Sequence, residues 1–184
     1  MVVLRAYLVL LMVAAAGVRA DAQDDLEYQV KAAFLFNFAK FVEWPADAFK
    51  GPEDPIRICV AGEDPFGASL DDAVHGETVS GRRLTVQRTR SLSKLRECHL
   101  VFVPRSEGRR QSDILSSLQG SGVLTIGEDD GFLTGGGIIR FVLDHHRVRF
   151  EINLGAAQDN RLKLSSKLLS LARTVYSQLP GQGG

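Results

Sequence analysis

The sequence predicts an α/β domain with a largely parallel sheet, helices on both faces and an antiparallel hairpin appended to the sheet. Three runs of β-branched and apolar residues, at 56–62, 98–104 and 123–127, are typical of buried strands. Segments with helix start and stop signals separate them, and strands that alternate with helices favour a parallel sheet. Near the carboxyl end, two segments of alternating apolar and polar residues flank a short turn, which indicates the hairpin.

The composition limits the classes of partner. Lys plus Arg and Asp plus Glu number 22 each, so the formal net charge is zero. Nothing in this balance indicates binding to nucleic acid or to an anionic membrane surface. We therefore expect a partner, if there is one, to be recognised by shape.

The first 22 residues have the organisation of a secretory signal peptide. Arg5 precedes an apolar run over residues 6–18, and Ala20 and Ala22 stand at the spacing of a cleavage site. The run is shorter than the ~20 residues that cross a bilayer, although an uncleaved anchor is the alternative. We expect cleavage, export to the periplasm and one α/β domain over residues 23–184, a length that suits a single hydrophobic core.

The segment "KAAFLFNFAKFVEWP", residues 31–45, predicts an amphipathic helix that packs on the core. At ~100° per residue its apolar side collects Val30, Phe34, Leu35, Phe38, Phe41 and Val42, with Ala33 and Trp44 at the margin. Phe36 falls on the polar side and is our candidate for a partner contact, although a lone exposed Phe is ordinary. Asn37 falls on the apolar side, where we expect a buried amide with its hydrogen bonds satisfied.

The middle of the chain reads as strand, helix, strand. Residues 56–62 form a strand, and Asp64, Pro65 and Gly76 suit the cap, first turn and stop of a helix. Residues 82–89 alternate as a half-buried or edge strand would.

The second half continues this alternation and then changes. The helix over 106–122 should bury Ile114, Leu115 and Leu118, and the hairpin should pair residues 138–143 with 148–153. The final segment, residues 164–180, predicts one long helix from apolar residues at helical spacing, namely Leu164, Leu168, Leu171, Ala172, Val175 and Leu179.

Six segments, taken together and in order, resemble the YfiR family of periplasmic proteins. They are "YQVKAAFLFNFAKFVEWP", "ICVAGEDPFG", "CHLVFVP", "GFLTGGGIIRF", "VRFEINL" and "LSSKLLSLA". The resemblance implies Rossmann-like layering, a periplasmic location, no enzymatic activity and no cofactor. The best-understood member of that family restrains an inner-membrane diguanylate cyclase by binding the periplasmic part of that enzyme. That member is in turn sequestered by an outer-membrane lipoprotein.

The two cysteines, Cys59 and Cys98, match the first of two cysteine pairs in that repressor. The second pair should fall within residues 131–141, which contain no cysteine here, so nothing that depends on it carries over. An oxidising compartment favours a disulfide between Cys59 and Cys98, and a bridge between neighbouring strands is often easily reduced. The alternative is a pair of buried free thiols.

Catalytic and metal-binding patterns are weak. Cys59 and Cys98 with His99 offer too few ligands for zinc, and residues 144–147, "DHHR", read as a solvated turn. The acidic residues 128–130, followed by glycines 135–137, could hold calcium, but loop shaping is the favoured interpretation. Phosphate-loop and nucleophile-elbow motifs are missing from the sequence. We predict no catalytic residue, no metal and no cofactor.

The sequence thus predicts a periplasmic regulatory binding protein that acts through protein contact. The expected partner is the periplasmic part of an inner-membrane signalling protein such as a diguanylate cyclase, with an outer-membrane lipoprotein and a homodimer as further partners. The alternative is a small-molecule binding module, with its ligand at the carboxyl ends of the parallel strands near residues 62–66 or 127–131. An enzyme comes third.

Overall fold

The computed structural model describes residues 24–177 and contains one large sheet. The signal peptide predicted over residues 1–22 lies outside these residues. The eight strands of the sheet are ordered β10-β8-β7-β6-β5-β2-β4-β3. The strands are β2 (Ile56–Ala61), β3 (Thr78–Val79), β4 (Arg82–Thr89), β5 (Leu100–Val103), β6 (Leu124–Gly127), β7 (Ile139–Asp144), β8 (Arg147–Asn153) and β10 (Thr174–Tyr176). A separate pair joins β1 (Val42–Glu43) to β9 (Lys163–Leu164).

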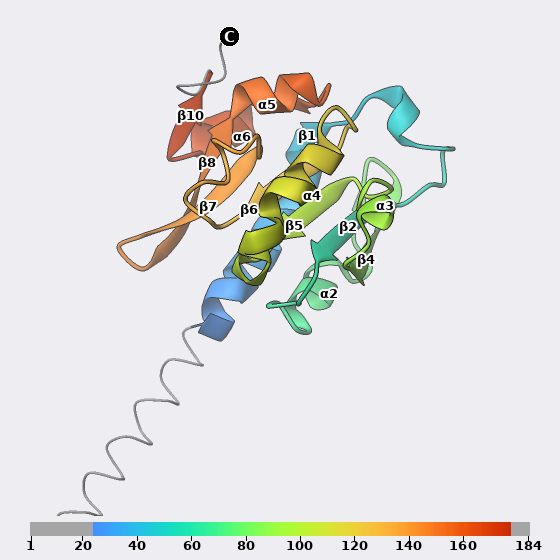
Figure 1. Cartoon of the computed structure of the whole chain (residues 1–184). Coiled ribbons are helices and arrows are strands. Elements are labelled where there is room, and N and C mark those ends of the chain that lie inside the picture. Colours follow the sequence, from blue (N-terminus) through green and yellow to red (C-terminus); the bar gives the residue numbers. More distant parts are fainter. Residues whose placement is uncertain (1–23, 178–184) are drawn as a thin grey trace, which may run out of the picture.

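The predicted fold class is confirmed. Strands β4, β2, β5, β6 and β7 run parallel, and β8 returns antiparallel to β7 as the appended hairpin. The helices are residues 24–41, which we call the amino-terminal helix, then α2 (Ser69–Val74), α3 (Leu92–Leu95), α4 (Gln111–Leu118), α5 (Leu154–Asp159) and α6 (Ser166–Leu171), with short 3-10 helices η1 (Ala46–Ala48) and η2 (Arg105–Arg110) (Figure 1).

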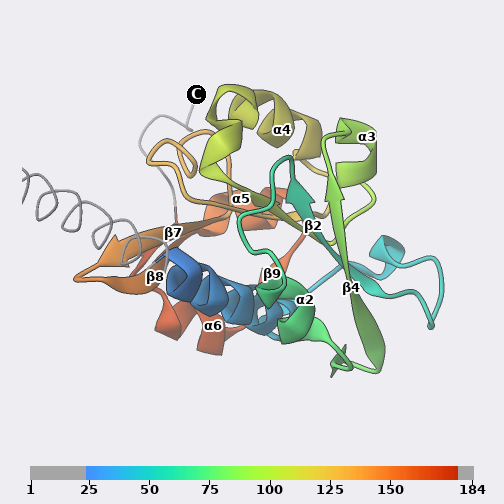
Figure 2. The ribbon, with the colours of Figure 1, turned by 90° about the horizontal axis from the view of Figure 1, so that it is seen from below.

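The central strands carry a core on each face because successive side chains point to opposite sides. In β2, Ile58 and Val60 enter the larger core, whereas Cys59 and Ala61 enter the smaller one. The amino-terminal helix, α2 and α6 lie on one side of the sheet, and α3 and α4 on the other (Figure 2). The sequence predicted three buried residues on α4, and all three are buried, namely Ile114, Leu115 and Leu118.

The hairpin has the register that its alternation predicts. Ile139 pairs with Ile152 and Phe141 with Phe150, and all four are buried. The third predicted pair, Leu143 with Val148, lies toward the tip, where Leu143 is 49% exposed. The sheet core therefore covers only part of this apolar stripe.

The prediction of one helix over residues 164–180 is wrong for the part that the structure describes. Leu164 belongs to β9, α6 spans only 166–171, and β10 follows at 174–176. Strand β10 pairs in parallel with β8, and the Arg173 amide donates to the Phe150 carbonyl oxygen. The free edge of β8 offers backbone partners to a β-branched and aromatic stretch, and this tertiary pairing overrides the helical period. Helix α2 is likewise shorter than the predicted 64–76.

The buried side of the amino-terminal helix differs from the predicted one. Its buried arc is Lys31, Ala32, Leu35, Phe38, Ala39 and Val42. Val30 and Ala33 are exposed, Phe34 and Phe41 are half-buried, and Asn37 is exposed, so the expectation of a buried Asn37 amide is wrong. The apolar residues cover more than half of the helix circumference at ~100° per residue, which is more than the sheet can bury. Among residues 24–177, no helix combines the length and apolar composition that a membrane span requires.

Candidate protein-contact surface

An exposed apolar surface runs along the outer side of the amino-terminal helix. We call it the apolar face and define it as Leu26, Val30, Phe34, Leu143 and Leu171. The exposed fractions of Leu26 and Leu171 are both 54%. Leu26, Val30 and Phe34 follow one another at a spacing of four residues, which puts them on one line of the helix. Four of the five large exposed apolar residues in the described part of the chain belong to this face.

Two grooves flank this line and meet at Phe34. The first, of about 420 Å³, lies between the helix and the β7–β8 hairpin, and Leu143 and Val148 form its far wall. The second, of about 240 Å³, lies between the helix and α6, where Leu171 forms the wall. Figure 2 shows the helix flanked by these two elements. The apolar face is therefore concave, with Phe34 as its shared floor.

The floor is held by an aromatic cluster. The ring centroid of Phe34 lies 5.9 Å from that of Phe38, 5.9 Å from Phe141 and 5.5 Å from Phe150. Phe38, Phe141 and Phe150 are buried, and aromatic rings at these separations attract one another beyond simple burial. Phe34 is thus a half-exposed ring on a fixed base, which is the form of an interface anchor.

Basic side chains line the rims of both grooves. Arg147 and Arg149 border the first, and Lys167 borders the second, with its Nζ 5.1 Å from the ring centroid of Phe41. All three residues are exposed. Within the described part of the chain, none of the three has a carboxylate oxygen within 4.0 Å. The rims therefore offer positive charge that the fold itself does not neutralise.

The contact candidate from the sequence, Phe36, lies on another side of the helix. It is half-buried against the larger core, and Lys40 Nζ lies 4.9 Å from its ring centroid. The structure does not bring it to the apolar face, and its contact role stays a prediction. Leu143 and Leu171 escaped sequence reasoning because each was assigned to a buried side. The signal that could have found the face is the width of the apolar arc on the helix.

The carboxyl ends of the parallel strands, where a small ligand was the alternative, are filled by the protein. A Cβ on Gly62, whose φ is +86°, would lie 2.1 Å from Glu107 Oε1, so the buried Glu107 carboxylate occupies that place. Arg110 Nη1 donates to Glu107 at 2.7 Å. Phe66, in the loop after β2, is buried against Phe102 at 4.7 Å between centroids.

A buried charge cluster closes the next loop. Lys31 Nζ forms ion pairs with Glu27 and Glu128, and both Lys31 and Glu128 are buried. The Tyr28 hydroxyl donates to Glu128 at 3.3 Å. Burial, reinforced by the negative charge of Glu128, raises the pKa of Tyr28 well above its ordinary value, so this hydroxyl stays a donor. Glu128 is thus a structural anchor for the amino-terminal helix and not a free calcium ligand.

The loop that follows has its own partners. Asp130 pairs with Arg140 at 3.0 Å, and Arg140 also reaches Glu151 at 2.7 Å. A Cβ on Gly137 would lie 2.2 Å from the Phe132 ring, so the glycines admit this buried ring. No group of three or more potential metal ligands gathers anywhere in residues 24–177.

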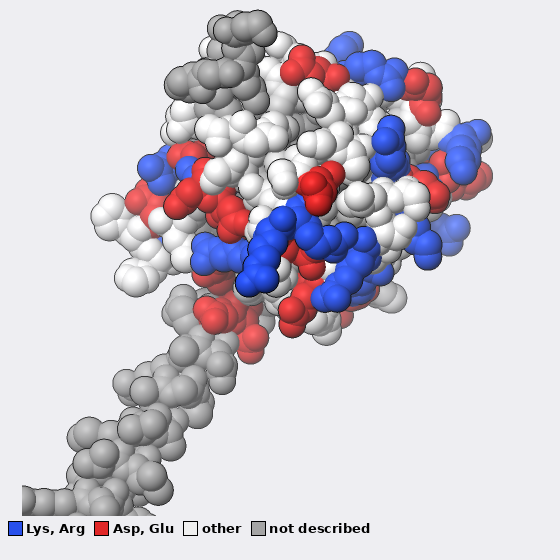
Figure 3. All heavy atoms as spheres, in the orientation of Figure 1, with Lys and Arg blue, Asp and Glu red and all other residues white. Residues whose placement is uncertain are grey.

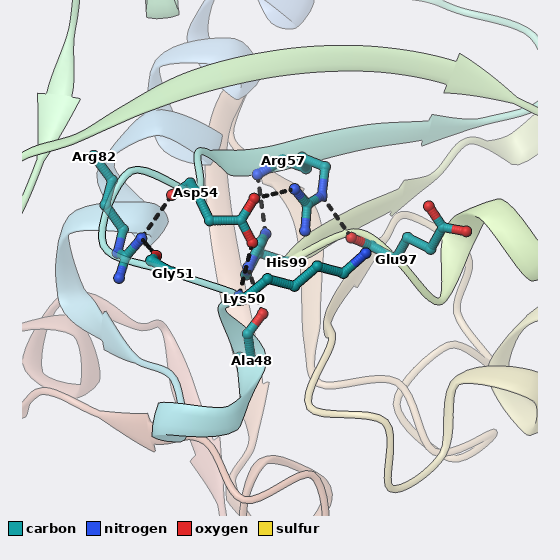
Figure 4. Close-up of polar contacts among 8 residues, drawn as sticks. All are labelled: Ala48, Lys50, Gly51, Asp54, Arg57, Arg82, Glu97 and His99. Carbon is teal, nitrogen blue, oxygen red and sulfur yellow. Dashed lines mark hydrogen bonds and ion pairs between the residues drawn. The ribbon is translucent and has the colours of Figure 1, made fainter.

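His99 is a buried structural residue at the start of β5 (Figure 4). The Arg57 amide donates to its Nδ1 at 3.0 Å, its Nε2 lies 3.2 Å from the Ala48 carbonyl oxygen, and its ring stacks on Phe49 at 4.4 Å. An Nδ1 that accepts a hydrogen bond must be unprotonated, and the Nε2–H then donates to Ala48. Burial, with the nearby Arg57 charge, lowers the pKa of His99 to about 4.

Asp54 completes this cluster by fixing Arg57. Asp54 Oδ1 accepts from Arg57 at 3.0 Å and its Oδ2 accepts from the Lys50 amide at 3.0 Å, as Figure 4 shows. The Arg57 hydrogen bond holds the pKa of Asp54 well below its ordinary range. The polar groups around His99 are thus largely engaged with one another.

The two cysteines form a disulfide. Cys59 lies in β2 and Cys98 just before the neighbouring β5, with Cα atoms 6.1 Å apart. Both residues are buried, and Cys98 borders a cleft of about 460 Å³ that His99 and Lys50 also line. The bridge closes a loop between two central strands, which is a structural role.

Charge on the opposite face of the molecule is mixed. Figure 3 shows Lys and Arg side chains interspersed with Asp and Glu over the region of α4 and η2. This arrangement contrasts with the apolar face, whose rims are basic.

Comparison with known proteins gives one family and, among solved structures, distant matches that include the following two. The chain has 10% identity to a conserved domain protein from Vibrio cholerae O1 biovar El Tor (TM-score 0.49) and 14% to the ABC domain from Streptococcus pneumoniae solved with L-Trp (TM-score 0.47). Each match covers 66% of this chain and 55% of the other, so the chain spans about half the length of these structures. No curated protein matches. A family model described as YfiR/HmsC-like matches residues 28–173, and proteins of this kind are known as periplasmic regulators of cyclic-di-GMP signalling. The chain belongs to the YfiR/HmsC-like family.

Proposed function

We propose that this protein restrains a membrane-bound diguanylate cyclase, or a related signalling receptor, by binding its periplasmic part through the apolar face. The observation that carries the proposal is the exposure of Leu26, Val30, Leu143 and Leu171 around two joined grooves. A contiguous apolar surface with a polar rim is typical of a protein contact site. Family membership supplies the regulatory role.

The proposal makes the protein a binding component without catalytic activity. The buried polar clusters at Glu107, Lys31 and His99 are satisfied by internal partners, which is what a scaffold requires. We extend the proposal to export into the periplasm, to release by an outer-membrane lipoprotein and to a homodimer as further partners. Reduction of the Cys59–Cys98 bridge is proposed to modulate the restraint.

The test is carried out in the bacterium that encodes the protein. Deletion of the gene should raise cellular cyclic-di-GMP, and the wild-type gene supplied in trans should lower it again. Val30→Glu and Leu171→Glu should each fail to do so, because each places a charge on the apolar face. Both side chains are already exposed, so we expect melting temperatures close to wild type. The intact mass of the periplasmic protein should lack the first ~20 residues.

Val175→Glu is the matched control. Val175 is an exposed apolar residue on β10 and lines neither groove. This variant should restore low cyclic-di-GMP as wild type does. Unchanged cyclic-di-GMP on deletion would contradict the regulatory role, and full restoration by Val30→Glu and Leu171→Glu would contradict the role of the apolar face.

The described residues do not favour the small-molecule alternative at the place that the sequence predicts. Its expected place, at the carboxyl ends of β2 and β6, is occupied by the Glu107 and Lys31–Glu128 clusters. It stays a prediction of the sequence, which equilibrium dialysis against periplasmic metabolites would test directly.

A further inference from the structure

We propose that the element bound by the apolar face is an amphipathic α-helix of the partner, whose apolar stripe is flanked by acidic residues. The inference rests on the proposed function for the identity of the partner, but the chemistry of the bound element follows from the face itself.

The length of the face suits a helix. Its line on the amino-terminal helix extends from Leu26 through Val30 and Phe34 to Phe41, and all four line the two grooves. Fifteen steps of ~1.5 Å make about 22 Å, which is four turns of a partner helix. Anchors at positions i, i+4, i+7 and i+11 of that helix span about 17 Å, which is enough to follow the line from the first groove into the second.

The backbone of the bound element favours a helix over a strand. The face is made of side chains, and the backbone groups of the amino-terminal helix interior bond within the helix. An extended segment would therefore lie in the grooves with its own N–H and C=O groups unpaired, which is costly. A helix satisfies these groups internally and presents only side chains. The free edges of the large sheet are β10 and β3, and the part of β8 before Phe150, which lines the first groove, pairs among the described residues with β7 only. An extended segment could pair along that short stretch alone, because the rest of the face is made of side chains.

The charge of the rims specifies acidic flanks. Arg147 and Arg149 stand on the hairpin side and Lys167 on the α6 side, so positive charge lies on both sides of the stripe. The carboxylate lining the first groove, Glu27, is already paired with the buried Lys31. A helix with Glu or Asp on both flanks of its apolar stripe would thus meet an opposite charge on each rim.

The shape favours a protein over a membrane surface. A basic and apolar surface can also adsorb to anionic lipid, which requires apolar side chains that project outward. Here Leu143 and Leu171 form walls and Phe34 forms the floor between them, so the apolar surface is hollow. A hollow apolar surface favours a protruding element of a protein over insertion into an acyl layer.

The probe is a hydrocarbon-stapled helical peptide of about 16 residues, with Leu at the four anchor positions and Glu on both flanks. Its binding to the full mature protein is measured by fluorescence anisotropy. The matched peptide carries Lys in place of every Glu, and an unstapled peptide of the same composition with alternating Leu and Glu represents a strand. We expect the Glu helix to bind at least about tenfold more tightly than the Lys helix, because three rim charges each contribute a fraction of a kcal/mol. It should also bind more tightly than the alternating peptide, which carries the same charges but leaves backbone groups unpaired in the grooves.

The charge-reversed protein, Arg147→Glu with Arg149→Glu and Lys167→Glu, makes the test reciprocal. It should prefer the Lys helix, with an unchanged melting temperature, because all three side chains are exposed and none pairs with a carboxylate among residues 24–177. Equal binding of both helices by wild type overturns the charge argument, tighter binding of the alternating peptide overturns the helix, and no binding of any peptide overturns the docking site. Binding to phosphatidylglycerol vesicles that competes with the Glu helix assigns the face to lipid. Peptide binding with no cyclic-di-GMP phenotype would refute the proposed function and leave the docking chemistry intact.

Discussion

Replacement of Lys31 by Met should destabilise the fold strongly, although lysine is a residue type that usually lies at the surface. Lys31 is 1% exposed, and its ammonium group lies between the carboxylates of Glu27 and Glu128. Met retains the apolar stem of the side chain, so the change removes the charge with little loss of packing. What remains are the Glu27 and Glu128 carboxylates without their cation, and Glu128 is only 5% exposed.

The expected magnitude follows from this burial. Removal of one partner from a buried ion pair costs about 3–5 kcal/mol, because the other charge stays desolvated. For a domain of this size 1 kcal/mol corresponds to about 2–4 °C, so the melting temperature should fall by roughly 6–20 °C. Urea unfolding followed by far-UV circular dichroism measures the free energy directly.

Two further variants separate the charge effect from packing. Lys40→Met changes an exposed lysine on the same helix and should alter stability by less than about 0.5 kcal/mol. Lys31→Met combined with Glu128→Gln also removes the more deeply buried of the two carboxylates and should recover much of the loss. A free energy of unfolding for Lys31→Met within about 0.5 kcal/mol of wild type would refute the argument, since burial of an unpaired carboxylate should destabilise the fold by more than that.

Three other predictions use the same unfolding assay. The Cys59–Cys98 bridge closes a loop of 39 residues, so a dithiol should lower stability by about 4 kcal/mol without unfolding the domain, and two free thiols in the unreduced, denatured protein would reject the bridge. The pKa of His99 is about 4 in the fold and ~6.5 in the unfolded chain, so the fold favours the neutral imidazole. The contribution of His99 to the free energy of unfolding is therefore fully present above pH ~6.5 and decreases as the pH falls toward about 4. The loss should reach roughly 3 kcal/mol and largely vanish in His99→Gln. Phe38→Ala should cost ~3–5 kcal/mol, and Phe36→Ala clearly less because Phe36 is half-buried; equal losses would end the contact hypothesis for Phe36.

Local sequence determined the elements that are buried on both sides. Strands β2, β5 and β6 are continuous apolar runs between turn residues, and no helical or exposed arrangement suits six or fewer such residues followed by Gly or Pro. The hairpin register followed from alternation, because a shift of one residue would move Phe141 and Phe150 to the wrong face. The disulfide followed from the compartment that the signal peptide predicts.

Tertiary structure decided which side of an ambiguous element faces inward. The amino-terminal helix has apolar residues around more than half of its circumference, so its period alone could not choose between Lys31 and Val30 as the inner residue. The choice depends on Glu128, nearly a hundred positions away, whose buried carboxylate requires a cation.

The same dependence on distant partners governs the carboxyl-terminal segment and the candidate site. Residues 174–176 form a strand because β8 leaves an unpaired edge there, a condition that no local window contains. The apolar face exists only where three separate elements, the amino-terminal helix, the hairpin tip and α6, meet around Phe34. A contact surface assembled from distant segments depends on packing, whereas the strands that carry it depend on their own residues.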